Sequence, residues 1–528
     1  VGVGDMSGDV FGNGMLRSEQ TRLIAAFDHR DIFIDPDPDM ASSFSERQRL
    51  FDLPRSSWQD YDKALISRGG GVFSRKDKTI PLSAEMRALL DLPGQKATPN
   101  EVLRAILRAR ADLLFFGGIG TFVRAESESD ERVGDRANDA IRVTAGELRV
   151  RVVGEGANLG MTQLARVAYC LGGGRCNSDA IDNSAGVNTS DVEVNIKIAL
   201  RRAIRDGRLD MKRRDRLLVA MTGDVADLVL RNNYEQTLAI SLAEGRGLAY
   251  LGFEGQLMRT LERRGLLDRK VEALPDDVAL AEREKAGRPL TRPELGVLLA
   301  FAKIALKVDL IAAGVADDPA LDDELLRYFP ARMAKSWRED IEAHPLRAEI
   351  IATRIANALI NRGGPTFGLR VGERTGAAPL DIARAYVVVR DAYRLPELEA
   401  GIDALDNRIP GGEQLGLYRL VQDLLTGRTV WFLRNVPLGE GIAPVVEAYG
   451  RTIAALFAML GEVLPERFRG VFGETAARLE SLGVPPELAH RLAMLPALGA
   501  APDIHLVAAA TGAPLEQAAR VFFETASA

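Results

Sequence analysis

Cysteine and histidine are scarce in this chain of 528 residues, which has two cysteines and four histidines. The cysteines, Cys170 and Cys176, match no zinc or redox spacing, and the scattered histidines suggest no cluster of metal ligands. We therefore predict that the protein holds no metal and works in a reducing, cytoplasmic setting.

Long apolar runs and an excess of positive charge are also missing. The longest apolar runs, such as residues 295–306, are shorter than a membrane span and contain a lysine. The chain does not open on a basic and then apolar signal pattern. Its net charge is −6 and its pI is about 5.6. We therefore expect a soluble intracellular protein that has neither nucleic acid nor a membrane as its partner.

The first part of the chain predicts an α/β domain. Strand-like apolar runs at residues 22–28, 111–118 and 148–156 are each followed by turn residues, and helical stretches lie between them. The opening VGVG looks like the tail of a strand whose beginning has been cut away. Strands that alternate with helices favour a mostly parallel sheet, so we predict one such domain over residues 1–205.

The second part predicts an all-α region over residues 206–528. Apolar residues recur every three or four positions at residues 215–233, 295–311 and 348–362. The tail, residues 503–526, is typical of two short helices around a glycine–proline turn. A division into two subdomains near residue 345 is one interpretation of this region.

The opening stretch VGVGDMSGDVFGNG has the form of a phosphate-binding turn. Gly2 and Gly4 would make the tight turn and let the backbone approach a pyrophosphate, and Ser7 or Gly8 would let the following helix pack closely. Asp28 ends the next apolar run, where a carboxylate can bind an adenosine ribose and repel a 2′-phosphate. These features predict a Rossmann-like domain that prefers NAD to NADP. The alternative is a strand–helix turn whose glycines serve packing only.

A second polar cluster follows the strand-like run that ends near residue 155. Asn158 lies just after that run, and Asn183 and Ser190 lie in DNSAGVNTSDVE, which opens a long helix. Ser190 and Glu193 form a capping-box pattern, so Ser190 can be a helix cap alone. The two asparagines can equally be turn residues. From the residues alone, ligand binding and these local roles remain open.

These motifs resemble the glutamate dehydrogenase family, whose coenzyme domain carries EGAN and a later NAGGVTVSxxE pattern. This chain has EGAN at 155–158 and NSAGVNTS at 183–190, followed by Glu193. Longer stretches, such as FDHRDIFIDPDPD and NALINRGGPTFGLR, resemble the large, multidomain NAD-specific bacterial glutamate dehydrogenases. The resemblance covers the whole chain and corresponds to the C-terminal portion of such an enzyme, a coenzyme-binding domain plus a helical C-terminal domain.

The resemblance implies specific roles for these positions. Asn158 and Asn183 would hold the nicotinamide half of NAD, and Ser190 would bind the side-chain carboxylate of glutamate. Gly118, in the loop GGIGT after a strand, would line the same crevice, although its glycines can also serve the turn alone. The remaining predicted coenzyme residues are Gly2, Gly4, Ser7, Gly8 and Asp28. Asp5, which stands where smaller family members have asparagine, would have to point away from the phosphates.

The reaction implied is NAD-dependent oxidative deamination of L-glutamate to 2-oxoglutarate and ammonia. It needs a general base, which the family takes from a lysine and an aspartate of a separate substrate domain. We expect that domain to precede Val1, so that no catalytic residue lies in this chain and the chain alone is inactive. The missing domains of the same polypeptide and a homo-oligomer are the expected partners. The alternatives are a dehydrogenase of another amino acid and a non-catalytic scaffold that responds to NAD.

Overall fold

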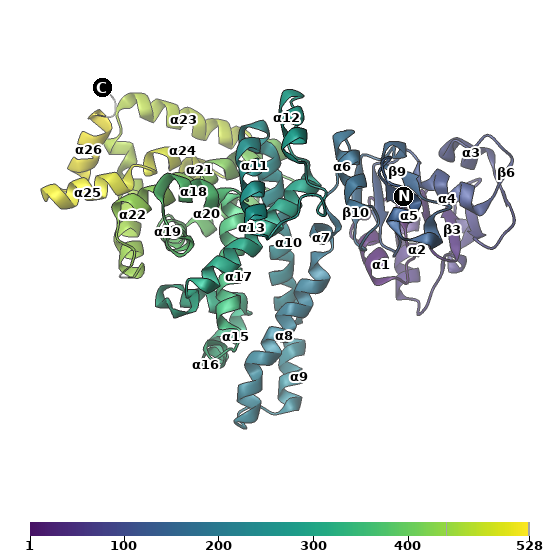
Figure 1. The fold of residues 1–528 in the computed structure, drawn as a ribbon, viewed down its shortest axis with the longest axis horizontal. Helices are drawn as coiled ribbons and strands as arrows, with labels where there is room; N and C mark the ends of the chain where they lie inside the picture. Colours follow the sequence, from purple (N-terminus) through teal and green to yellow (C-terminus); the bar gives the residue numbers. More distant parts are fainter. Residues whose placement is uncertain (440, 526–528) are drawn as a thin grey trace. The chain divides into compact units, whose positions relative to one another are not determined.

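The computed structural model describes residues 1–439 and 441–525, and these form two compact units (Figure 1). The first comprises Val1–Ser190, Val229–Asn233 and Asp268–Val297, and the second comprises Asp191–Leu228, Tyr234–Leu267 and the described residues from 298 onward. The first is α/β and the second is all-helical, which confirms the predicted fold class. The predicted boundaries at 205 and 345 stay predictions.

A six-stranded sheet forms the centre of the first unit, in the order β10-β7-β1-β2-β3-β4. β1 pairs in parallel with β2 and β7, and β7 pairs in parallel with β10. β3 and β4 run antiparallel at the other edge, so the sheet is mixed but mostly parallel. The strand bounds are β1 Gly2–Val3, β2 Ala25–Phe27, β3 Asp31–Ile34, β4 Gly71–Ser74, β7 Leu113–Phe116 and β10 Val152–Glu155.

Helices cover both faces of this sheet. Successive residues of a strand point to opposite faces, so neighbouring residues pack in different apolar clusters. Phe27 packs in one apolar cluster with residues of α3 (Ala84–Leu90), α4 (Pro99–Leu107) and α6 (Gln163–Leu171). Ala26 packs in the other cluster, with residues of α1 (Asp9–Met15) and α2 (Met40–Asp52). Both clusters are apolar, which is why the strands are continuous hydrophobic runs rather than alternating ones.

The glycines of the opening stretch allow α1 to lie very close to the sheet. A Cβ added at Gly2 would lie 2.6 Å from the Phe11 ring, and one added at Gly4 or Gly117 would lie 2.7 Å from Phe11 atoms. Gly4 also has φ +141°, a conformation that other residues rarely adopt. The three glycines therefore serve the packing of one phenyl ring.

Close packing also accounts for the two glycines inside α1. A Cβ at Gly12 would lie 2.5 Å from the Phe51 ring, and one at Gly14 would lie 2.8 Å from the Phe115 ring. Their helix-weakening cost of about 1 kcal/mol each is thus offset by contacts that alanine could not make.

Smaller elements complete the first unit. They are the strand pairs β5 (Ile80–Pro81) with β6 (Lys96–Ala97) and β8 (Val123–Arg124) with β9 (Val143–Thr144), and the helices α5 (Asp130–Val133), α7 (Asp179–Asp182) and α12 (Asp277–Lys285). A capping box formed by Thr98 and Glu101 begins α4. The long helices α8 (Ser184–Arg205), α10 (Thr222–Arg246) and α13 (Arg292–Ala312) contain residues of both units.

The second unit is a bundle of helices. Those predicted from periodicity are present as α13, α17 (Arg347–Gly363) and, around the glycine–proline turn, α25 (Ala501–Thr511) and α26 (Leu515–Thr525). The predicted segment 215–233 is helical but is divided at Met221 between α9 (Met211–Ala220) and α10. The others are α11 (Leu248–Arg263), α14 (Asp322–Tyr328), α15 (Ala331–Ser336), α16 (Arg338–Glu342), α18 (Phe367–Thr375), α19 (Pro379–Ala392), α20 (Leu395–Asp403), α21 (Gly411–Asn435), α22 (Ala443–Val463), α23 (Glu466–Ser481) and α24 (Pro486–Leu498).

One helix of the described residues, α22, is long and apolar enough to cross a membrane, judged by length and composition alone. The bent pair α24 and α25 would also qualify if it formed one span. In the bundle, α22 packs against α19, α24, α25 and α26. Core helices of soluble proteins share this composition, so the predicted absence of a membrane partner stays a prediction.

Candidate functional site

Four parallel strands end at the same edge of the sheet, and the predicted site residues follow three of these ends directly. Gly4 follows β1, Asp28 follows β2, and Gly118 lies just beyond the end of β7. Asn158 lies in the loop after β10. The chain passes from β1 to β2 on one side and returns to β7 on the other side of β1, so β1 and β7 flank a topological switch point. Open α/β sheets bind ligands at this position.

The loops at this edge contact one another. A Cβ added at Gly118 would lie 3.4 Å from the Cα of Gly4, so the loops after β1 and β7 run side by side. A Cβ added at Gly156 would lie 2.5 Å from Cγ1 of Val10, which places the loop after β10 against α1. A side chain at Gly156 would collide with Val10 and Phe115, whereas Gly118 leaves its backbone in ordinary contact range of the loop after β1.

Asp5 points into the first loop rather than away from it. Its Oδ1 accepts hydrogen bonds from the Ser7 N–H (2.9 Å), the Ser7 hydroxyl (2.6 Å) and the Gly8 N–H (3.1 Å). Its Oδ2 lies 3.3 Å from Nη2 of Arg30. The amides of Ser7 and Gly8, which sequence reasoning gave to a pyrophosphate, therefore already have an acceptor.

Asp28 lies beside that loop but is enclosed. Its Oδ1 accepts from the N–H groups of Arg30 (2.6 Å) and Asp31 (2.7 Å), which fixes the turn between β2 and β3. Its Oδ2 is buried, and no described residue donates a hydrogen bond to it, although Nη2 of Arg30 lies 3.6 Å away. Asp28 therefore fixes this turn, and its role as a ligand-binding residue stays a prediction.

The Asp5 and Asp28 carboxyl groups lie against each other, so their titrations are coupled. Burial and the contact with Asp5 raise the pKa of Asp28 above its ordinary value. The pKa of Asp5 is lowered despite its burial, because its contacts with Asp28, Ser7 and Arg30 favour the charged form. Asp28 therefore keeps its proton to a higher pH than Asp5 does.

Asn158 and Asn183 meet although they are 25 positions apart in the sequence. The amide group of Asn183 donates to Oδ1 of Asn158, and Asn158 is exposed. Asn183 lies between α7 and α8, as the residue that ends α7. Two adjacent amide side chains at the rim can offer both a donor and an acceptor to a carboxamide or to sugar hydroxyls.

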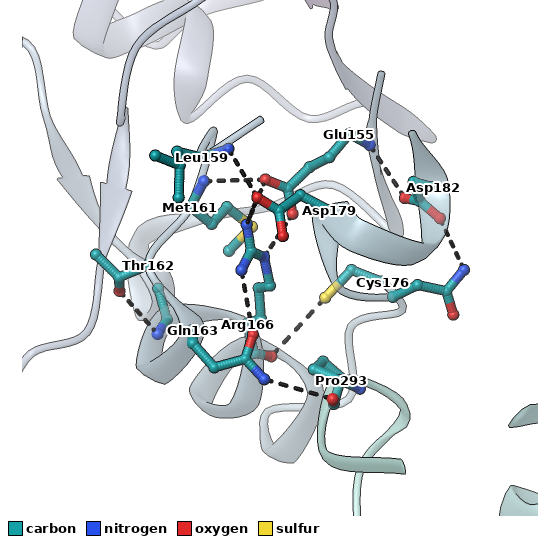
Figure 2. A network of polar contacts seen from close by, with 12 residues as sticks. Glu155, Leu159, Met161, Thr162, Gln163, Arg166, Cys176, Asp179, Asp182 and Pro293 are labelled. Carbon is teal, nitrogen blue, oxygen red and sulfur yellow. Dashed lines mark hydrogen bonds and ion pairs between the residues drawn. The ribbon is translucent and has the colours of Figure 1, made fainter. Parts of the chain in front are cut away.

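A buried ion pair holds the loop that carries Asn158 (Figure 2). Arg166 of α6 donates to both carboxylate oxygens of Glu155, at 2.6 and 2.9 Å. Both side chains are almost fully buried, at 0% exposure for Glu155 and 4% for Arg166. Oε1 of Glu155 also accepts a hydrogen bond from the Met161 N–H at 3.2 Å. The ion pair is therefore linked to both the start and the end of this loop.

The same network reaches α7, next to Asn183. Asp179 lies 3.2 Å from Arg166 and accepts from the Leu159 N–H at 2.9 Å. Asp182 accepts from the Glu155 N–H at 3.1 Å and from the Asn177 side chain at 2.8 Å. These bonds tie the loop after β10 to the segment before α8, which explains why the two asparagines meet.

The backbone is strained next to Asn158. Leu159 has φ +61°, in the left-handed region that β-carbon-bearing residues avoid, and its side chain is 61% exposed. Such strain costs about 1 kcal/mol or more and is common at functional sites. The bond from the Leu159 N–H to Asp179 maintains this conformation.

Ser190 is not at the start of a helix. α8 begins at Ser184, so Ser190 lies in its second turn and its side chain is exposed. The expected capping box with Glu193 is therefore wrong, and Glu193 pairs with Lys197 instead. The prediction was wrong because DNSAGVNTSDVE contains several residues that can cap a helix, and the helix begins at an earlier one, Ser184. A ligand role for Ser190 stays a prediction.

The remaining predictions are that this chain contains no catalytic lysine and no metal site. Lys63, Lys76, Lys78, Lys96 and Lys197 have exposed side chains. Among the described residues, no group of three or more histidine, cysteine and acidic side chains could hold a metal ion. Sequence reasoning missed the network of Glu155, Arg166 and Asp179, although an acid at the end of an apolar strand was a signal that could have found it.

The architecture is that of a Rossmann-like α/β unit followed by a helical region, with its polar loops gathered at the switch point. Comparison with known families agrees with this class. Residues 1–243 match the model described as "Bacterial NAD-glutamate dehydrogenase, catalytic domain", and residues 287–528 match "Glutamate dehydrogenase, C-terminal". The chain therefore belongs to the bacterial NAD-specific glutamate dehydrogenases.

Individual relatives are similar over nearly the whole chain. The NAD-specific glutamate dehydrogenase of Pseudomonas aeruginosa is 46% identical over 528 residues, which is 100% of this chain and 33% of the relative. That of Halomonas elongata is 44% identical over 524 residues, and that of Mycobacterium tuberculosis is 43% identical over 500 residues. These cover 99% and 93% of this chain, and 32% and 30% of the relatives. The chain thus spans about a third of their length.

Proposed function

We propose that this chain supplies the coenzyme-binding half of an enzyme that oxidatively deaminates L-glutamate to 2-oxoglutarate and ammonia with NAD. The observation that carries the proposal is the convergence of Gly4, Gly118 and the Asn158–Asn183 pair at one edge of the sheet. The family assignment supports the same activity, since three relatives carry the name NAD-specific glutamate dehydrogenase.

The residues present fit NAD at this edge. Gly4 and Gly118 lie side by side and have no side chains, so a dinucleotide could come into close contact with their backbone atoms. Asp28 has an orphaned, buried oxygen that a ribose hydroxyl could satisfy once Arg30 moves aside. A carboxylate at the position of Asp28 competes with the 2′-phosphate of NADP, so we expect NAD to be preferred, and this preference has to outweigh the nearby Arg30 and Arg75.

When bound, NAD supplies the hydride acceptor, and the chain's own residues position it. Asn158 and Asn183 hold the nicotinamide end through its ribose or carboxamide. The Glu155–Arg166 pair keeps both asparagines in place by anchoring the loop after β10. Ser190, exposed on α8 seven positions after Asn183, binds the side-chain carboxylate of glutamate.

The general base belongs to a part of the enzyme outside this chain. The five lysines considered above are exposed surface residues, and none of them lies in a matching family motif. The relatives are about three times as long, which leaves room for a separate substrate domain. A cytoplasmic location and a homo-oligomeric assembly belong to the same proposal.

Calorimetric titration of the chain with NAD, NADP and glutamate tests the proposal. We expect heat with NAD, much weaker heat with NADP, and no production of NADH from glutamate by the chain alone. The complete enzyme should oxidise glutamate faster than leucine or phenylalanine. Absence of NAD binding would contradict the proposal and favour a scaffold, and turnover by the isolated chain would refute the assignment of the base.

A matched pair of variants tests Ser190 in the complete enzyme. Ser190→Ala should raise the KM for glutamate and leave the Kd for NAD unchanged. Ser481→Ala, also an exposed serine in a helix, should change neither quantity. Equal effects of the two substitutions would remove Ser190 from the substrate site.

A further inference from the structure

The structure brings together two cysteines that sequence spacing had set aside. Sγ of Cys170, at the end of α6, lies 3.5 Å from Sγ of Cys176. Cys170 is partly exposed and Cys176 is buried. The turn between them has exposed residues at Gly172, Gly173 and Arg175. We call Cys170 and Cys176 the thiol pair.

The geometry points to the thiol pair as an oxidation site, which a hydroperoxide or a low-molecular-weight disulfide converts into an intramolecular disulfide. A disulfide bond is about 2 Å long, so each sulfur has to move by less than about 1 Å. Both thiols are already in mutual contact, and no element of secondary structure has to be broken to join them.

The surroundings of the two sulfurs give them different roles. The Cys170 sulfur and burial raise the pKa of Cys176 well above its ordinary value, so Cys176 keeps its proton. The Cys176 thiol also lies 3.8 Å from the carbonyl oxygen of Arg166. Cys170, next to the exposed glycine turn, is therefore the sulfur that an oxidant meets first.

With hydrogen peroxide, the Cys170 thiolate attacks one oxygen and the O–O bond breaks. The products are a sulfenic acid on Cys170 and hydroxide, which takes a proton to become water. The Cys176 thiol then loses its proton as its sulfur attacks the Cys170 sulfur, and the S–O bond breaks to release a second water. Two thiols are oxidised by two electrons in total, and one peroxide is reduced to two waters.

The new bond would act on the segment that leads to Asn183. Asn177, next to Cys176, donates to Asp182, and Asp182 accepts from the Glu155 N–H. Cys176 and Asn177 also line a cavity of about 410 Å³ with Glu155, Gly156 and Asp182. A disulfide bond that moves Cys176 toward α6 therefore shifts Asn177 and its hydrogen bond to Asp182 of α7. This consequence depends on the proposed coenzyme function, but formation of the disulfide does not.

Peptide mass spectrometry tests the modification directly. Trypsin cuts after Arg175, between the two cysteines, so the disulfide joins the peptides 167–175 and 176–197. We expect the joined peptides after treatment with hydrogen peroxide or oxidised glutathione, and separate peptides after reduction. Cys176→Ser should leave a sulfenic acid or a glutathione adduct on Cys170, whereas Cys170→Ser should leave Cys176 unmodified.

Two results would overturn the assignment. One is separate oxidation of each cysteine without joined peptides, and the other is equally rapid modification of Cys176 in Cys170→Ser. The coenzyme consequence has its own readout. Oxidation should raise the Kd for NAD several-fold, reduction should restore it, and Cys176→Ser should show no such change. Joined peptides with an unchanged Kd would refute only the link to the coenzyme, and failure of the reduced protein to bind NAD would refute the proposed function while the oxidation site stands.

Discussion

The carboxyl groups of Asp5 and Asp28 lie against each other at the edge of the sheet, although they belong to loops that follow different strands. Two carboxylates so close cannot both ionise without repulsion, so Asp28 keeps its proton to a higher pH than an ordinary aspartate. Arg30 lies within 3.6 Å of both side chains and offsets the remaining charge. The loops after β1 and β2 are therefore coupled electrostatically.

The first prediction concerns the pH dependence of folding stability. The raised pKa of Asp28 means that its stabilising contribution is present at low pH and is lost as the pH rises through that pKa. Asp5, whose pKa is lowered, contributes in the opposite sense, since its contribution is lost as the pH falls through its pKa. Asp28→Asn keeps the neutral form at every pH. We expect the stability of this variant relative to wild type to increase as the pH rises.

Urea unfolding at a series of pH values measures this difference. Asp227→Asn, a change of an exposed aspartate, is the control and should leave the pH profile unchanged. In the same series, Asp28→Asn should weaken NAD binding and reduce the ratio of the affinity for NAD to the affinity for NADP. A variant profile parallel to wild type would show that the pKa of Asp28 is not raised in the folded protein.

The second prediction concerns the asparagine pair. Asn158→Ala and Asn183→Ala should each weaken NAD binding about tenfold, because each removes a side chain that bonds the coenzyme or its neighbour. The double variant should weaken binding by less than the product of the two effects, since the asparagines act as one unit. Calorimetry measures the Kd, and Asn435→Ala, at an exposed asparagine of α21, is the control. Full additivity would show that the asparagines act separately.

The third prediction separates stability from positioning in the buried ion pair. Glu155→Ala should destabilise the first unit by about 3–5 kcal/mol, because it leaves Arg166 charged and buried without its main partner. The double change Glu155→Leu with Arg166→Met should recover most of that stability. It should not recover NAD affinity, because the loop of Asn158 would remain without its anchor. Recovery of both quantities would mean that the pair has only a structural role.

The fourth prediction concerns Lys303, within the helical unit. Burial lowers its pKa to about 8, and the nearby Glu235 only partly opposes this effect. Below pH 8 the folded protein must therefore accept a charge in an unfavourable place. Lys303→Met should stabilise the protein at neutral pH by up to about 3 kcal/mol, given an unfolded pKa near 10.4.

The pH dependence makes this test specific. Wild-type stability should rise between pH 8 and about 10, where the unfolded chain still binds the proton that folded Lys303 has lost. Lys303→Met should lack that rise. Lys212→Met, at an exposed lysine of α9, should retain it. The midpoint of urea unfolding measured across this range decides between these outcomes.

Much of the fold could be predicted because its signals are local. The apolar runs predicted at residues 22–28, 111–118 and 148–156 contain the parallel strands β2, β7 and β10. β3 and β4 were not predicted: β3 follows β2 after a turn of only three residues, and β4 pairs with β3 from residues 71–74, too far along the chain to leave a local pattern. Their presence makes the sheet mixed.

The site was harder to predict, because its details depend on which group takes which hydrogen bond. The sequence shows that Asp5 lies in the glycine loop, but not that its carboxylate bonds to the amides of Ser7 and Gly8. It shows Ser190 in a cap-like context, but not that α8 already begins at Ser184. It gives Arg166 no special pattern, and only the fold brings that side chain to Glu155.

The packing of Phe11 has a consequence for how this family can diverge. One aromatic ring touches Gly2, Gly4 and Gly117, which belong to a strand end and to two separate loops. A methyl group at Gly2 would collide with the end of the ring, whereas one at Gly117 would also collide with the Phe11 Cα, which every residue has. In homologous sequences we therefore expect glycine to stay at positions 4 and 117 whatever residue stands at position 11, and Gly2 to be replaced only where position 11 carries a smaller side chain.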